Sequence, residues 1–97
     1  MTSSQASQNE RDGEILRGLA AAKPEAFHRF FEEWFPRVYA FAERRLASRP
    51  HAECVTARAL RRALAEAPRL DPATPIAPWL LEHLRREIRW AERAGPP

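Results

Sequence analysis

Between Pro24 and Ser48, aromatic and aliphatic residues recur at steps of three and four, which is the spacing of one side of an α-helix. The members of this stripe are Phe27, Phe31, Trp34, Val38 and Phe41, and it is widened by Phe30, Phe35, Tyr39 and Leu46. So broad an apolar side needs neighbours on several flanks, so it predicts the central helix of a small bundle. Pro36 lies inside the pattern and predicts a kink or a short break.

Three further segments also carry helical patterns. The first is expected over residues 12–22, with Asp12 as a candidate N-cap, and the other two over 50–67 and 78–94. The third of the four helices is rich in alanine, which would let it pack closely against the aromatic helix. Gly95-Pro96 is a typical stop for the last one.

The segments between and before these helices are polar or rich in proline. Residues 1–11 are rich in Ser, Gln and Asn, and they predict a disordered tail. The loop "PRLDPATPIAP" carries four prolines, too many for a helix. The sequence therefore predicts an all-α, four-helix domain over residues 12–95.

Charge is distributed unevenly along the 97 residues. The net charge of +3 comes entirely from residues 49–97, and Lys23 is the only lysine among the 16 basic residues. Guanidinium groups suit contacts with phosphates and bases, although a preference for arginine also follows from genome composition. With a polar N-terminus, one cysteine and no long apolar run, the sequence predicts a cytoplasmic protein without a membrane span.

No catalytic or metal-binding pattern stands out. The histidines, His28, His51 and His83, do not form an HExxH zinc motif, and a glycine-rich phosphate loop is absent from the sequence. Cys54 has no nearby activating base, so it is interpreted as an ordinary residue of a helix surface. We therefore expect no enzyme activity, no metal, no cofactor and no small-molecule substrate.

The last predicted helix, "PWLLEHLRREIRWAERAG", carries two stripes. Its core stripe comprises Leu80, Leu84, Ile88 and Ala91, with Leu81 beside it. The second stripe, about 100° away, comprises Trp79, Arg86, Trp90 and Arg93, and Arg85 and Arg89 lie on the remaining polar side. Two interpretations are open: the arginines pair with Glu82, Glu87 and Glu92 along the helix, or bases stack on tryptophan while arginine neutralises phosphates.

Taken in order, these segments resemble region 2 of the extracytoplasmic-function sigma factors over about residues 12–93. The likeness rests on Ala26-Phe27, on "FPRVY" from Phe35 to Tyr39, on Ala52-Glu53, and on Trp79-Leu80 after the proline-containing loop. The resemblance implies a domain that docks on the clamp coiled coil of the RNA polymerase β′ subunit. It also implies that the loop and the last helix hold single-stranded promoter −10 DNA.

The resemblance yields two sets of candidate residues. The nucleic-acid-binding set is Arg69, Trp79, Arg85, Arg86, Arg89, Trp90 and Arg93. The partner-binding set is Glu53, Arg58, Arg61 and Arg62.

The sequence departs from the family pattern on the predicted docking surface. Cys54 replaces the family's Asp, Ala57 replaces its Gln, and Arg58 reverses the charge of its Glu. Charge reversal at an interface excludes an old partner or selects a new one. The family's Asn and a later Asp are missing from the last helix, and its upstream-reading helix-turn-helix domain is expected to be missing too. Two functions therefore stay open: a region 2 that contacts polymerase, promoter DNA or both, or a degenerate copy that binds a regulatory protein without DNA.

Overall fold

The protein is an all-α domain with four helices, as the sequence predicted. The computed structural model describes residues 3–94, and within them the helices are α1 (Ser3–Ala20), α2 (Pro24–Arg45), α3 (Arg49–Glu66) and α4 (Ile76–Ala94). A short 3-10 helix, η1 (Ala67–Arg69), follows α3 directly. The expected stop at Gly95-Pro96 lies outside the described residues.

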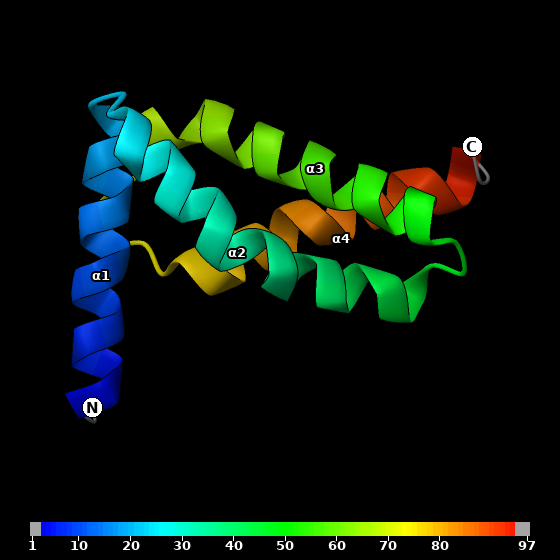
Figure 1. Ribbon diagram of the computed structural model, residues 1–97, viewed down its shortest axis with the longest axis horizontal. Helices are drawn as coiled ribbons and strands as arrows, with labels where there is room; N and C mark the ends of the chain where they lie inside the picture. Colours follow the sequence, from blue (N-terminus) through cyan, green and yellow to red (C-terminus); the bar gives the residue numbers. More distant parts are fainter. Residues whose placement is uncertain (1–2, 95–97) are drawn as a thin grey trace.

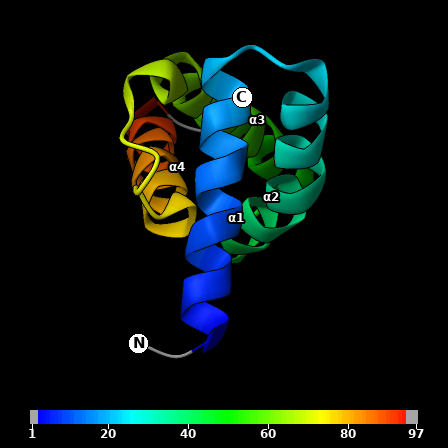
Figure 2. The same ribbon diagram turned by 90° about the vertical axis from the view of Figure 1, so that its left-hand side faces the viewer.

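Three of the helices form the body of the domain, and the fourth closes one end. Figure 1 shows α2, α3 and α4 running broadly along the long axis, while α1 crosses their ends at a steep angle. Figure 2 looks at that end, where α1 passes in front of the other helices and its first turns project beyond them. No helix among residues 3–94 is both long enough and apolar enough to cross a membrane.

The first helix differs from the prediction, because it begins at Ser3 and includes most of the segment expected to be a disordered tail. The sequence 6–11 contains Ala, Gln, Glu and Arg, which have good intrinsic helix propensity. Gln8 also supports the extension by donating from Nε2 to the Asp12 carboxylate over 2.8 Å. Residues 1 and 2 of the predicted tail lie outside the described residues.

Asp12 caps a helix, but not the one that the sequence indicated. It lies inside α1, and its carboxylate accepts a hydrogen bond of 3.0 Å from the backbone N–H of Ile76, the first residue of α4. Only 3% of Asp12 is exposed. A carboxylate at a helix N-terminus accepts a hydrogen bond from a free N–H group and interacts favourably with the positive end of the helix dipole. Asp12 therefore fixes the start of α4 against α1.

The central helix α2 starts at Pro24, as predicted, and continues through Pro36 to Arg45. Figure 1 shows it bent partway along, without a break. Its fully buried row is Ala26, Phe30, Trp34, Val38 and Ala42, which overlaps the predicted stripe only in part. Phe41 was expected in the core, yet 49% of it is exposed.

Helices α3 and α4 form the other half of the core. Ala52, Ala59 and Ala63 of α3 are completely buried, so the small side chains allow close packing as expected. The predicted core stripe of α4 (Leu80, Leu84, Ile88 and Ala91) is buried, which confirms that prediction. The helix begins two residues earlier than expected, at Ile76, because Asp12 caps it there.

Candidate nucleic-acid interface

Four arginines from three elements meet in a groove between α3 and α4, which we call the arginine groove. They are Arg62 of α3, Arg69 of η1, and Arg86 and Arg93 of α4, and they surround Trp90, Glu66, Glu87 and His83. The groove has a volume of about 400 Å³. Arg69 lies in η1, which follows α3 directly and contacts α1 and α3. The structure thus unites four residues of the predicted nucleic-acid-binding set, namely Arg69, Arg86, Trp90 and Arg93.

Trp90 is the large apolar side chain of the arginine groove. It is 49% exposed, which is unusual for tryptophan and leaves part of the ring open to a flat partner. The guanidinium of Arg58 lies over the ring, 4.5 Å from its centre. This cation–π contact covers one side of the indole and limits how the ring can turn.

Glu87 anchors the wall of the arginine groove. It is buried, and it accepts from Arg58 Nε at 3.0 Å and lies 2.8 Å from Arg62 Nε. A buried carboxylate needs such partners because removing an unpaired charge from water is costly. Glu87 therefore joins α3 to α4 and holds Arg58 over Trp90.

The ion pairs between arginines and glutamates within α4 are weaker than the first of the two interpretations of this helix implied. Glu82 lies 4.0 Å from Arg85 and 3.8 Å from Arg86, distances at the outer limit of an ion pair. Exposed pairs of this kind contribute little to stability. Arg86 is therefore held only loosely, and its charge stays available to a ligand.

Trp79 does not belong to the exposed stripe where the sequence placed it. It is 9% exposed, and its Nε1 donates to Glu66 Oε1 over 2.7 Å. Its ring packs at an angle against His83 and Phe30. Trp79 is a core residue with a satisfied N–H, so it offers no surface for a base.

Two other arginines of the predicted set lie away from the arginine groove. Arg85 lines a separate hollow between α4 and the end of α2. Arg89 is exposed and lines none of the grooves described in this structure. The adjacent residues Arg85 and Arg86 thus lie on different sides of α4.

The predicted partner-binding residues do not form a single surface. Arg62 lines the arginine groove, Arg58 lies beside it over Trp90, and Arg61 is exposed. Glu53 instead lines a small hollow with Phe35, Tyr39 and Arg49 on the α2 side. There the pKa of Arg49 is raised above its usual value, chiefly by a hydrogen bond with the Tyr39 side chain and also by the charge of Glu53.

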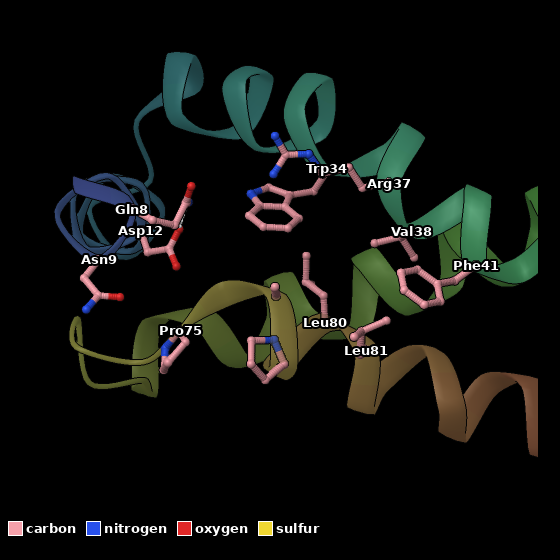
Figure 3. A pocket seen from close by; sticks show the side chains of 12 residues that line it. Gln8, Asn9, Asp12, Trp34, Arg37, Val38, Phe41, Pro75, Leu80 and Leu81 are labelled. Atoms are coloured by element: carbon pink, nitrogen blue, oxygen red, sulfur yellow. Dashed lines mark hydrogen bonds between the residues drawn. The ribbon is translucent and has the colours of Figure 1, made fainter. Parts of the chain in front are cut away.

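A second groove, which the sequence did not predict, lies between α1, α2 and the first half of α4 (Figure 3). Its walls are mostly apolar, and we call it the apolar groove. Phe41, which the sequence pattern had placed in the core, lines one end of it and is 49% exposed. A stripe wider than any one neighbouring helix was the available signal that some of it would stay uncovered.

Among residues 3–94, no group of three or more His, Cys, Asp and Glu side chains could hold a metal ion. Comparison with protein-family models, curated proteins and solved structures finds no match to this chain. The candidate sites therefore rest on their geometry and on the resemblance described above.

Proposed function

We propose that the chain is a cytoplasmic, sigma region 2-like transcription protein that binds single-stranded promoter DNA in the arginine groove. The observation that carries the proposal is the convergence of Arg69, Arg86 and Arg93 around the exposed Trp90. The ordered likeness to region 2 supports it, because in that family the loop and the last helix handle melted promoter DNA.

The groove supplies the two kinds of contact that a single strand requires. Arg69, Arg86 and Arg93 neutralise backbone phosphates, and a base stacks on the open side of Trp90. Stacking on an aromatic side chain contributes about 1–3 kcal/mol per base. Arg58 does not contact the strand in this arrangement, because it covers the other side of the indole and is held there by Glu87.

The first test measures fluorescence anisotropy of a labelled −10-like single strand with the whole chain. Trp90→Ala is expected to weaken binding about tenfold, since it removes the stacking surface. Trp90 is exposed, so circular dichroism should show an unchanged fold. Arg85→Ala is the matched control, because it removes one positive charge from α4 outside the groove. Unchanged affinity in Trp90→Ala would contradict the proposal.

The second test concerns RNA polymerase. We propose that α3 binds the β′ clamp coiled coil only weakly, because Cys54 and Ala57 lack the polar groups of the family and Arg58 reverses a charge. Restoring them with Cys54→Asp and Ala57→Gln should strengthen capture of the coiled coil in a pulldown. Tight capture by the unmodified chain would show that these departures do not matter.

A second function is a module that binds a regulatory protein, of the anti-sigma kind or another transcription component, without DNA. Two observations favour it: Arg58 already covers one side of Trp90, and Glu66 and Glu87 place negative charge in the groove. A pulldown from native cytoplasm separates the two functions. Recovery of polymerase supports the first function, and recovery of another protein, together with no single-strand binding by anisotropy, supports the second.

A further inference from the structure

The apolar groove is the largest hollow described on the molecule, with a volume of about 780 Å³. Figure 3 shows Trp34 and Val38 of α2 facing Leu80 and Leu81 of α4, with residues of α1 closing one end. Phe41 forms part of the opposite end and is half exposed. Trp34, Val38 and Leu80 are buried in the floor, so Phe41 is the large apolar side chain left open here. An exposed aromatic ring at the end of an apolar groove favours a binding surface.

The groove continues along α2 and α4 beyond Phe41. Phe41 and Leu81 also line a smaller hollow of about 180 Å³, whose other apolar residues are Leu84 and Ile88. The two hollows share these side chains and therefore adjoin each other between α2 and α4, and we call the pair the channel. A channel of this shape suits an extended apolar strip better than a compact ligand.

The rim of the channel is basic. Arg44 and Arg45 border the smaller hollow, and neither has an ion-pair partner among the residues that the structure describes. Arg85 stands opposite, 4.0 Å from its nearest carboxylate. Farther along, Arg37 Nη2 lies 3.9 Å from Glu33 Oε1, and the guanidinium lies 4.9 Å from the centre of the Trp34 ring. An apolar floor beneath such a rim is complementary to a partner that combines apolar and acidic groups.

Trp34 supplies an independent sign of a missing partner. It is 5% exposed, and its Nε1 has no hydrogen-bond partner among the described residues. In Figure 3 the indole lies in the middle of the groove with its nitrogen turned toward the α1 end. Leaving a buried donor unsatisfied costs about 1–3 kcal/mol, so an acceptor carried by a ligand would stabilise the complex.

We propose that this channel binds an acidic amphipathic helix of another protein. The apolar side of that helix packs on Phe41 and Leu81, and its carboxylates meet Arg37, Arg44, Arg45 and Arg85. At the α1 end of the channel, an acceptor of the partner pairs with Trp34 Nε1, which is buried in the free protein and turns outward on binding. Amphipathic helices bind grooves between helices in this manner, with anchors every three to four residues.

The charges argue against a second copy of this chain as the occupant. In a twofold dimer through this surface, the same patch of both copies would face itself, and Arg44 and Arg45 would approach their own equivalents. Like charges across an interface oppose association. The proposal is independent of the arginine groove, which lies on the other side of α4.

The test uses two labelled amphipathic peptides of about 18 residues, long enough for a helix to form on binding. They share one leucine and phenylalanine side, and they carry glutamate or lysine elsewhere. Anisotropy with the whole chain should show at least about tenfold tighter binding of the glutamate peptide. Phe41→Ser, and separately Arg44→Glu with Arg45→Glu, should each weaken it about tenfold, while Trp90→Ala should not change it.

Trp34→Phe sharpens the test, because it keeps an aromatic ring but removes the N–H group. It should lower the affinity for the glutamate peptide about threefold or more, as expected for loss of one hydrogen bond. The proposal would be overturned by equal affinity for the two peptides, or by a glutamate-peptide affinity that Phe41→Ser leaves unchanged. A dimer in sedimentation that Phe41→Ser dissociates would also overturn it and assign the channel to a second copy.

Discussion

The two grooves flank the same helix, α4, yet their chemistry differs. The arginine groove, on the α3 side, places four arginines around one tryptophan that is half exposed. The apolar groove, on the α2 side, has aliphatic and aromatic walls and keeps its arginines at the rim. The first suits a phosphate backbone with flat bases, and the second suits an amphipathic protein segment.

The difference comes from where carboxylates lie and what they bind. On the α3 side, Glu66 and Glu87 bind Trp79, Arg58 and Arg62, so polar groups can line the floor without being left unsatisfied. On the α2 side, the buried carboxylate of Asp12 is committed to the N-terminus of α4. The rest of that groove is mostly apolar, with Gln8 and Asn9 at the α1 end and the buried N–H of Trp34.

The largest expected contrast is in the response to salt. With about three phosphate contacts, single-strand affinity should fall about a hundredfold between 50 and 500 mM salt. Binding of the glutamate peptide should fall less than about tenfold, because much of it comes from apolar burial that salt does not screen. Anisotropy titrations at both salt concentrations check this, and equal slopes would remove the distinction between the grooves.

Asp12→Ala tests whether one buried carboxylate shapes the apolar groove. It leaves the Ile76 N–H unsatisfied and should lower the free energy of unfolding by about 1–3 kcal/mol, measured by urea denaturation. Peptide binding should weaken, since α1 and the start of α4 lose their connection. Glu14→Ala, an exposed change on the same helix, is the control and should leave both quantities nearly unchanged.

The adjacent residues Arg85 and Arg86 offer a reciprocal test. Arg86→Ala should weaken binding of the single strand about three- to fivefold, because it removes one phosphate contact. It should leave the affinity for the glutamate peptide unchanged. Arg85→Ala should have the opposite selectivity, because Arg85 lies at the rim of the channel. Both effects are read by anisotropy, and if each variant weakened both ligands alike, only net charge would matter.

The smallest expected effect comes from Glu87→Gln. Removing this negative charge should strengthen single-strand binding about two- to threefold, because nearby arginines are less neutralised. The variant should also be less stable, since it weakens the link between α3 and α4. Weaker single-strand binding by the folded variant would instead mean that orienting Arg58 and Trp90 matters more than charge.

Local spacing predicted much of the fold. The starts of α2 and α3 were close to the observed ones because Pro24 and Pro50 occupy first-turn positions. The core stripe of α4 was confirmed, since Leu80, Leu84 and Ile88 are too apolar to remain exposed. The prolines of the loop also marked where the chain leaves α3.

Tertiary contacts determined what spacing could not. Trp79 and Trp90 are eleven residues apart, which places them on nearly the same side of α4. Neighbouring side chains cover only the first of them, so Trp79 is buried and Trp90 is not. The role of Asp12 depends on Ile76, a residue far away in the sequence, and no local pattern indicates that contact.

The most direct test of two separate binding surfaces uses the three tryptophans as reporters. Trp34 lines the apolar groove, Trp90 lines the arginine groove, and Trp79 lies in the core between α3 and α4. A nitrogen–proton correlation spectrum records the indole N–H signals of Trp34, Trp79 and Trp90, each assigned by substitution to phenylalanine. We expect a single strand to shift the Trp90 signal and the glutamate peptide to shift the Trp34 signal, whereas neither ligand should shift the Trp79 signal. If both ligands shifted the same indole signal, the two grooves would not be separate sites.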